Sequence, residues 1–535
     1  MVVGGSLTRG LDIKLDGDVS IEEMAVGRFI TIQGQQRRFF GVVTDVTLVS
    51  ADPALPQSPP DVSNSFIAQV VMGTSTFGNV HAIPYLSLGL GDDSLLEGPL
   101  PAKTVPPHFS LARDTDPKEI QQIFGENDDK HIWIGSPLDM EEAPVCLSVD
   151  RVTERSTGVF GKTGTGKSFL TRILLAEIVQ KSQAVSLIFD MHNEYGWSAR
   201  SEDRTEVKGL KQLFQSKVAV FTLDEESARA RGLSADFVVQ IGYDDISAQD
   251  IATLAGTLGL NETQVQAAER LQRRLGQHWL REFLKRESVD DLREMADGTE
   301  HEGTIAALHR RLQRLTSLPF LVETPQDNSV RRLMERLERG IHVVVEFGRY
   351  TNNLTAYILV ANLLTRRIHE QYVDRMERAL GKQADEPRPL IIAIEEAHKF
   401  LSPEVAGNTA FGTIARELRK YNVTLLVIDQ RPSGIDNEIM SQIGTKITCL
   451  LDDERDVDAA LAGVSGRNEL RAVLAKLETK QQALIYGHAV PMPVVVRTRN
   501  YDAEFYRSVG SAGAMEPAAR RAILDQTTDD LFGKR

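Results

Sequence analysis

The sequence predicts an α/β protein with a small β-barrel at its N-terminus and a helical insertion in its main domain. Three observations support this fold class. Hydrophobic strands alternate with helical stretches after about residue 150, a glycine-rich loop joins one strand to a helix, and the segment before residue 105 is rich in short strands. Alternating strands and helices are typical of a largely parallel sheet covered on both faces.

The N-terminal part, residues 1–105, contains β-branched and aromatic runs separated by glycine and proline. The runs at Gly27–Gln33, Phe39–Thr47 and Phe66–Val71 predict strands of a small β-barrel. A proline-rich connector follows. We therefore interpret residues 106–150 as a linker strap between the barrel and the main domain.

The remaining chain divides into two parts of one core, an insertion and a tail. Residues 151–234 and 339–500 carry the core strands, whereas residues 235–338 have a helical periodicity with many charges. Residues 501–535 are polar and are expected to brace a neighbouring subunit. The predicted core strands after the glycine-rich loop lie at 184–190, 217–223, 341–347, 390–395, 423–428 and 446–451.

Composition narrows the classes of function. The chain has 535 residues, too many for one core, and its 61 Lys and Arg against 75 Asp and Glu give a net charge of -14. This charge argues against a protein that coats nucleic acid over its whole surface, although a local basic channel stays possible. No apolar run is long enough to span a bilayer and the N-terminus lacks a signal-peptide core, so we expect a cytoplasmic protein with no membrane partner. Cys146 and Cys449 have no partners at zinc spacing and are expected to be reduced and structural.

The glycine-rich loop has the sequence GKTGTGKS and matches the phosphate-binding loop pattern. It stands between a predicted strand and a predicted helix, which is the context that this pattern requires. Backbone N–H groups and the helix N-terminus would hold the phosphates of ATP, Lys167 would reach the β- and γ-phosphates, and Ser168 would ligate Mg²⁺. The predicted nucleotide contacts in this loop are Gly161, Lys162, Thr163, Gly164, Thr165, Gly166, Lys167, Ser168 and Phe169.

A second motif supplies the acids for hydrolysis. The apolar run 390–394 ends in Glu395 and Glu396, at the carboxyl edge of a sheet where ligands bind. Adjacent strand residues point to opposite faces, so we assign Glu395 to Mg²⁺ through water and Glu396 to the general base. Gln430 follows the next strand and is expected to sense the γ-phosphate.

Two further groups have candidate roles in this site. Asp190, His192 and Glu194 follow another strand, and we favour a role around Mg²⁺ and its waters over direct metal ligation for them. Arg416 and Arg419 lie on one helix. In a single chain they are a solvated basic face, whereas in an oligomer they are able to reach a neighbour's γ-phosphate.

With these motifs in order, the chain resembles the HerA branch of the HerA/FtsK translocase superfamily, in its bacterial form. The resemblance rests on GKTGTGKS with Arg155 upstream, and on FDMHNEYG, IAIEEAHKF, ARELRKYN and IDQRPSGID. It implies a RecA-like ATPase core, a homohexamer around double-stranded DNA, and Arg155, Arg416 and Arg419 as candidate phosphate contacts. Glu395 stands where the family often has Asp, and Leu418 stands where it often has Gly.

The resemblance also implies partners. A NurA-type nuclease in DNA end processing, or an effector subunit in antiviral defence, is expected. The leading hypothesis is an ATP-dependent, hexameric double-stranded DNA translocase or helicase that works with such a partner. The alternative is an ATP-controlled ring scaffold that assembles the effector with little net DNA movement, and a conjugation-type coupling ATPase ranks below both because those usually carry membrane anchors.

The DNA contacts stay open between two regions. A basic run in the insertion is either a phosphate-tracking surface or, more often in proteins, a solvated helix face. Lys399 and the Ser402–Thr409 loop are the other candidates for facing a DNA channel. The basic run comprises Arg270, Arg273, Arg274, Arg281, Lys285 and Arg286.

Overall fold

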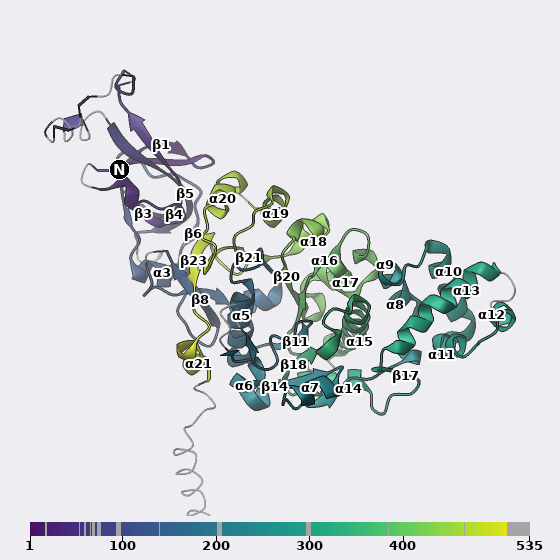
Figure 1. The fold of residues 1–535 in the computed structure, drawn as a ribbon. Coiled ribbons are helices and arrows are strands. Elements are labelled where there is room, and N and C mark those ends of the chain that lie inside the picture. The colour runs from purple at the N-terminus through teal and green to yellow at the C-terminus, as the bar shows by residue number, and fades with distance from the viewer. Residues whose placement is uncertain are drawn as a thin grey trace, which may run out of the picture.

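The computed structural model contains a β-rich N-terminal part, a central α/β part and a helical extension, arranged in a row (Figure 1). It describes residues 1–510 apart from 17–18, 53, 58–59, 62, 65, 67–69, 72–75, 92–97, 139, 201–205, 296–300, 383–384 and 465. The part of the tail beyond residue 510, predicted to brace a neighbour, lies outside the described residues.

The N-terminal part is an antiparallel sheet built around two long strands, β4 and β5, which pair over most of their length. Two backbone hydrogen bonds join Val2 of β1 to Phe109 and Ser110, just before β7, so the two edges of the sheet approach each other. A closed barrel stays a prediction. In order across the sheet, the strands are β1 (Val2–Ser6), β2 (Gly10–Lys14), β5 (Thr76–Gly89), β4 (Arg37–Ser50), β3 (Phe29–Gln33) and β7 (Leu111–Asp114), with β6 (Leu100–Pro101) paired to β5.

One predicted N-terminal strand is wrong. The described residues of 66–71, which are Phe66, Val70 and Val71, are helical, and the strand that follows begins at Thr76. Phe66 is 72% exposed, so its apolar character does not reflect burial in a sheet. The β-branched composition that predicted a strand here did not distinguish an exposed apolar segment from a buried one.

The central part contains a twelve-stranded sheet. Its strands from β15 to β21 are parallel, and the remaining four are antiparallel. The mixed α/β class is therefore confirmed. In order, the strands are β15 (Phe237–Val238), β14 (Val218–Thr222), β18 (His342–Glu346), β11 (Val185–Asp190), β19 (Leu390–Glu395), β20 (Val423–Asp429), β10 (Thr157–Phe160), β21 (Thr445–Thr448), β22 (Gln482–Gly487), β23 (Val494–Thr498), β8 (His131–Pro137) and β9 (Val145–Ser148).

The segment interpreted as a linker strap, residues 106–150, belongs partly to this sheet. It contains β7 of the N-terminal sheet, then α3 (Pro117–Phe124), and then β8 and β9, which extend the central sheet beyond β23. Ile132, Ile134, Val145 and Leu147 in these two strands are buried in the core. The strap prediction failed because it weighed the prolines of the connector above these short apolar strands.

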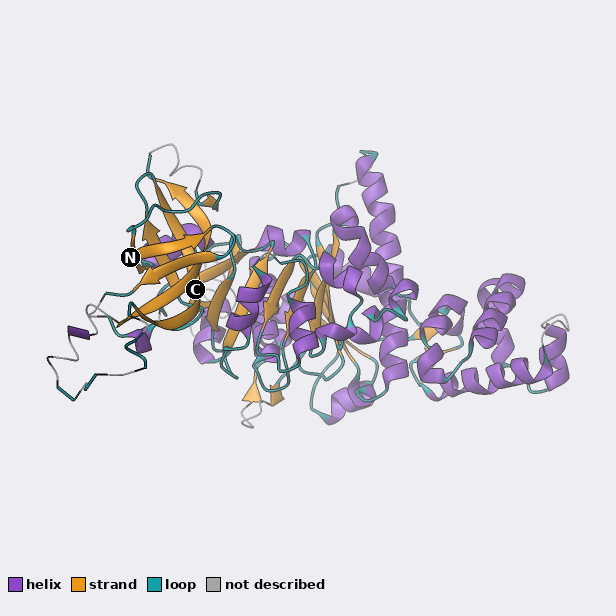
Figure 2. Cartoon of the chain, turned by 90° about the horizontal axis from the view of Figure 1, so that it is seen from above, coloured by secondary structure: helices purple, strands orange, loops and turns teal. Residues whose placement is uncertain are grey.

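Helices cover both faces of the central sheet (Figure 2). Strand β19 shows why: Ile392 and Ile394 lie in the apolar core on one face, and Ile391 and Ala393 lie in the core on the other, as a two-residue period requires. The helices of this part are α4 (Val149–Glu154), α5 (Lys167–Lys181), α6 (Leu210–Phe214), α7 (Glu225–Ala230), α14 (Ser329–Glu338), α15 (Leu354–Leu380), α16 (His398–Leu401), α17 (Ala410–Glu417), α18 (Asn437–Gln442), α19 (Glu454–Ala460), α20 (Arg467–Leu474) and α21 (Ala503–Gly510).

The helical extension occupies the end of the molecule away from the N-terminal sheet (Figure 1). It packs around buried Trp279, whose indole N–H donates to the carbonyl of Ile246 at 2.9 Å. The prediction that strands disappear between 235 and 338 missed three two-residue strands, β15, β16 (Ile241–Gly242) and β17 (Leu321–Val322). The helices of the extension are α8 (Ala248–Thr253), α9 (Ala255–Leu258), α10 (Glu262–Leu275), α11 (Trp279–Leu284), α12 (Val289–Met295) and α13 (Glu302–Leu312).

None of the helices in the described part of the chain is long and apolar enough to cross a bilayer.

Candidate nucleotide-binding site

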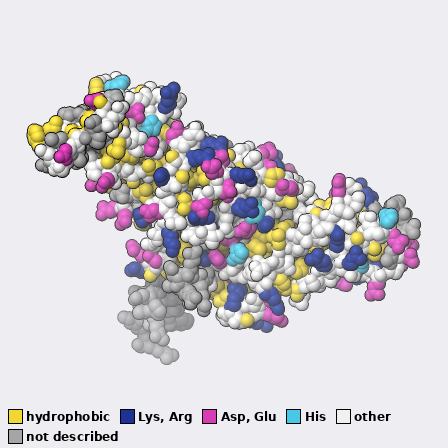
Figure 3. Space-filling model, turned by 45° about the horizontal axis from the view of Figure 1, so that its top comes forward, with side chains coloured by type: hydrophobic (Ala, Val, Ile, Leu, Met, Phe, Trp, Pro, Cys, Tyr) yellow, Lys and Arg dark blue, Asp and Glu magenta, His cyan; other side chains and the backbone are white. Residues whose placement is uncertain are grey.

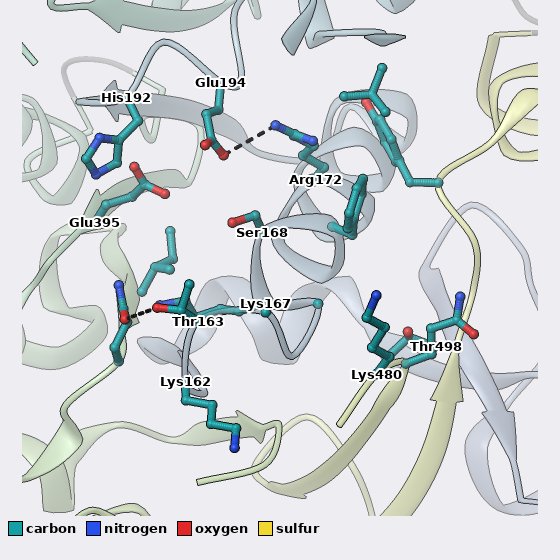
Figure 4. Close-up of a pocket in the computed structure, with 18 of the residues that line it drawn as sticks. Lys162, Thr163, Lys167, Ser168, Arg172, His192, Glu194, Glu395, Lys480 and Thr498 are labelled. Carbon is teal, nitrogen blue, oxygen red and sulfur yellow. Dashed lines mark hydrogen bonds and ion pairs between the residues drawn. The ribbon is translucent and has the colours of Figure 1, made fainter. Parts of the chain in front are cut away.

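The glycine-rich loop connects β10 to the N-terminus of α5, as the sequence predicts. Gly164 and Gly166 have φ angles of 83° and 89°, a left-handed conformation that residues with a β-carbon adopt at a cost. The loop forms one wall of a pocket of about 550 Å³ (Figure 4). The loop residues that line the pocket are Lys162, Thr163, Gly164, Gly166, Lys167, Ser168 and Phe169.

Two loop residues predicted to contact nucleotide do not line the pocket. Gly161 and Thr165 are not among the residues that line the pocket. The Thr165 hydroxyl is buried and donates to the carbonyl of Lys162 at 2.8 Å. Lys162 itself forms an ion pair with Asp452, its Nζ lying 2.7 Å from Oδ2. The loop is therefore braced from within and from the segment between β21 and α19.

Glu395 is the last residue of β19 and faces the pocket from a buried position, 8% exposed. Its Oε1 accepts a hydrogen bond from the Tyr195 hydroxyl at 2.8 Å, and its Oε2 has no hydrogen-bond partner among the described residues. Burial raises the pKa of Glu395 to about 8, and the nearby carboxylate of Asp190 adds to the rise.

Glu396 lies one residue past β19 with a φ of 49°, which is uncommon for a residue other than glycine. We expected strand alternation to send Glu395 and Glu396 to opposite faces. Both line the same pocket, because the left-handed turn at Glu396 brings its side chain round to the pocket. Its Oε1 accepts from the Gln430 amide at 3.0 Å, and Gln430 Oε1 accepts from the Thr163 hydroxyl at 2.7 Å.

This hydrogen-bonded series runs from the glycine-rich loop to Glu396 through Gln430. It forms because β19 and β20 are neighbours in register, with Glu395 opposite Ile428, so that their carboxyl ends lie side by side. Gln430 therefore stands between the loop and the second carboxylate; its role as a γ-phosphate sensor stays a prediction.

Lys167 is the first residue of α5 and lines the pocket. Burial lowers its pKa, and the carboxylates of Asp429, Glu395 and Glu396 oppose that effect. An ammonium group held at the floor of the pocket among these acids is placed to bind phosphate oxygens.

Asp190 does not line the pocket. It is fully buried and accepts backbone N–H groups of Glu194, Tyr195 and Gly196 at 2.7, 2.8 and 3.1 Å. Its carboxylate therefore shapes the loop after β11. His192 and Glu194 do line the pocket, and Glu194 forms an ion pair with Arg172 at 3.3 Å.

Sequence reasoning missed two parts of this region. Asp429, the buried last residue of β20, accepts hydrogen bonds from the backbone N–H groups of His398 and Arg431, both at 2.7 Å. Its carboxylate thereby joins the segments that follow β19 and β20. The sequence did contain a signal for Asp429, because it is an acidic residue that ends a buried strand, as Glu395 does.

The second missed part is the far wall of the pocket. Because β22 and β23 run antiparallel, the start of one and the end of the other reach the sheet edge where β10 ends. Tyr501 is buried there, with its ring centroid 6.5 Å from that of Phe169. The residues of this wall are Lys480, Gln481, Thr498, Arg499, Asn500, Tyr501 and Asp502.

Of the predicted arginines, Arg155 and Arg416 are not among the described residues that line this pocket. Arg155 lies two residues before β10, at the strand end opposite the glycine-rich loop, and is exposed. Arg416 is exposed on α17 and lies 3.4 Å from Glu438. Arg419 lies in the short helix Leu418–Tyr421, and its side chain is outside what the structure describes.

The residues at the pocket fit the Mg²⁺ ion that such a site implies. In the described part of the chain, no group of three or more His, Cys, Asp or Glu is arranged to hold a metal by itself. Magnesium in nucleotide sites takes few protein ligands and uses phosphate oxygens and waters for the rest. The Ser168 hydroxyl and the unpartnered Oε2 of Glu395 suit this mode of binding.

The raised pKa of Glu395 predicts a pH-dependent cost to stability in the protein without nucleotide. Between its ordinary pKa of 4.5 and about 8, the unfolded chain releases this proton while the folded protein keeps it. The free energy of unfolding therefore falls as pH rises through this window. Glutamine does not ionise, so Glu395→Gln avoids this loss. We expect the free energy of unfolding of the variant to exceed that of the wild type by roughly 2 kcal/mol at pH 8 and by much less at pH 5. Urea unfolding at both pH values measures the gain, and an equal difference at both would contradict the assignment.

The basic run in the insertion does not form one free surface. Arg274 donates to the carbonyls of Glu294 and Met295, Arg281 pairs with Asp244, and Lys285 pairs with Glu323. Arg273 pairs with Glu269 one turn away. On the face shown in Figure 3, Lys and Arg side chains are intermixed with Asp and Glu. These contacts favour the interpretation of the run as a structural, solvated helix face.

Comparison with protein families matches residues 132–368 to the central domain of helicase HerA. The chain is 26% identical to the DNA double-strand break repair helicase HerA of Pyrococcus furiosus over 71% of each chain. It is 24% identical to the protein of the same name from Sulfurisphaera tokodaii, over 94% of this chain and 92% of that one. These relatives are archaeal, and the bacterial form stays a prediction.

Among solved structures, the chain is similar to the bacterial conjugative coupling protein TrwB lacking its N-terminal segment. The identity is 15%, the TM-score is 0.48, and the match covers 72% of this chain and 92% of the other. VirB4 of Thermoanaerobacter pseudethanolicus is also similar, with 14% identity, a TM-score of 0.43, and coverage of 71% and 98%.

Proposed function

Since this chain is an ATPase of the HerA family, we propose that it is a double-stranded DNA translocase, driven by ATP hydrolysis in a homohexameric ring. The observation that supports this most is the series from Thr163 through Gln430 to Glu396. It ties the loop that would hold the γ-phosphate to the carboxylate that would activate water. A motor needs such a connection, because hydrolysis must respond to how the phosphates are held.

We propose specific roles for the pocket residues. Lys167 would neutralise the β- and γ-phosphates, and Ser168 would bind Mg²⁺, with Glu395 holding one of its waters. Glu396 would accept the proton of the attacking water, and Gln430 would orient that water and the γ-phosphate. Bound Mg²⁺ would neutralise charge that develops on the phosphates.

A ring would bring further arginines, from a neighbouring subunit, to the pocket. Among the described side chains, neither Arg155 nor Arg416 lines the pocket, and Arg155 stands at the end of β10 opposite the glycine-rich loop. In a head-to-tail ring, that end of the strand in one subunit is able to face the pocket of the next. We propose that at least one of these arginines stabilises the transition state across the subunit boundary, as arginine fingers do.

The proposed partner is a NurA-type nuclease in DNA end processing, or an effector in antiviral defence. The archaeal relatives are named double-strand break repair helicases, which favours end processing. The N-terminal sheet, which we propose forms a small barrel, lies at one end of the molecule and leaves the ATPase sheet free to assemble.

Steady-state ATP hydrolysis with and without linear double-stranded DNA tests this function. We expect linear duplex to raise the rate several-fold, with an effect that weakens as salt screens phosphate contacts. If the rate of ATP hydrolysis is the same with and without DNA, and the effector complex still forms, the result would instead support the ATP-controlled scaffold.

A further inference from the structure

The Glu395 carboxylate has two oxygens in contrasting situations. Oε1 accepts from the Tyr195 hydroxyl at 2.8 Å, whereas Oε2 is buried without a partner among the described residues. The main-chain carbonyl of the same residue accepts from the Tyr357 hydroxyl at 2.9 Å. A buried carboxylate oxygen without a partner is costly, so its persistence next to a pocket indicates a ligand there. In Figure 4 the Glu395 side chain lies across the pocket from Ser168.

Tyr195 is itself held rigidly. It is 1% exposed, and its backbone N–H donates to Asp190 at 2.8 Å, within the turn that Asp190 organises. Asn193, two residues earlier, exchanges two hydrogen bonds, both 3.0 Å, with the backbone of Gly348, two residues past the end of the neighbouring strand β18. The Tyr195 hydroxyl is therefore fixed in place by two strands of the sheet.

We propose that Tyr195 is a positioning residue for Mg²⁺. By donating to Oε1 it fixes the rotation of the Glu395 carboxylate, and so keeps Oε2 directed at the metal-bound water. The hydroxyl donates to Oε1 of Glu395, and Tyr195 is not among the residues that line the pocket. This inference rests on the proposed role of Glu395 in the nucleotide site. It assigns a role in the site to Tyr195 and Asp190, although neither lines the pocket.

Binding of ADP in the presence of Mg²⁺, compared with ADP and a chelator, tests the inference without turnover. Titration calorimetry on the full chain gives the gain in affinity that Mg²⁺ provides. We expect Tyr195→Phe to reduce that gain roughly tenfold, as losses of outer-shell partners do, and to leave the affinity for ADP with chelator unchanged.

The chain offers a matched control in Tyr357→Phe. This change also removes one buried hydroxyl bonded to Glu395, but from the main-chain carbonyl, so the gain from Mg²⁺ should stay within about twofold of the wild type. Glu395→Asp, whose shorter side chain withdraws from Tyr195, tests the same contact with Tyr195 intact. Glu395→Asp should reduce the gain in ADP affinity from Mg²⁺ by a similar factor. The double variant with Tyr195→Phe should reduce it little further.

The outcomes separate the inference from the proposed function. If the wild type binds ADP equally well with and without Mg²⁺, the proposed metal site at Ser168 and Glu395 is wrong. If Mg²⁺ raises the ADP affinity of the wild type and of Tyr195→Phe equally, the positioning role of Tyr195 is wrong. The role is also wrong if Tyr357→Phe reduces this effect of Mg²⁺ as much as Tyr195→Phe does. Should Tyr195→Phe fail to fold, Glu395→Asp decides: an undiminished gain in that variant overturns the inference.

Discussion

Glu396→Gln is expected to bind ATP with near wild-type affinity and to hydrolyse it about 10²- to 10⁴-fold more slowly. Glutamine keeps the size of the side chain and is still able to bond to Gln430, but it accepts no proton from water. The Glu396 side chain lines the pocket beside the glycine-rich loop, so the loss falls on the chemical step. Single-turnover hydrolysis and nucleotide binding, measured on the same preparation, separate the two effects.

Glu404→Gln is the control for this variant. Glu404 follows Glu396 in the same connection between β19 and β20, but it is exposed, bonds to Ser402 and is not among the residues that line the pocket. It should hydrolyse ATP as the wild type does. Normal turnover in Glu396→Gln would remove Glu396 from the role of base.

Lys167→Ala is expected to weaken ATP binding by about 10- to 100-fold, the effect of losing charge-assisted hydrogen bonds to phosphate. Lys167 begins α5 at the floor of the pocket, close to the acids Glu395, Glu396 and Asp429. Removing its positive charge leaves those carboxylates to repel the triphosphate. Equilibrium titration with a fluorescent ATP analogue measures the loss.

Lys118→Ala serves as the comparison, because Lys118 is exposed on α3 and is not among the pocket residues. Its affinity for ATP should equal that of the wild type. If Lys167→Ala binds ATP as tightly as Lys118→Ala, the glycine-rich loop does not hold the triphosphate as we propose.

Strand and loop positions in the core were predictable because their signals are local. The apolar run before Glu395 predicted β19 to the residue, and GKTGTGKS predicted the turn into α5. Residues 106–150 were misjudged because β8 and β9 are short and join a sheet built mostly from residues far along the chain. Sequence periodicity does not report such long-range pairing.

The phosphate side of the pocket could be predicted, whereas its far wall could not. Glycines and strand-ending acids mark the former, but Lys480, Asn500 and Tyr501 come together only through the antiparallel return of β22 and β23. The role of Asp190 shows a similar limit. Its place after a strand was evident from the sequence, but its three backbone partners depend on the tight turn that it stabilises.

Movement of duplex DNA by the wild type tests the central claim most directly. A linear duplex that carries a third strand near one end reports movement, because a translocase strips that strand as it passes. With ATP and Mg²⁺ the wild type should displace the third strand, whereas Glu396→Gln, which binds ATP without hydrolysing it, should leave it in place. A wild type that hydrolyses ATP on this DNA and leaves the third strand bound would contradict the account.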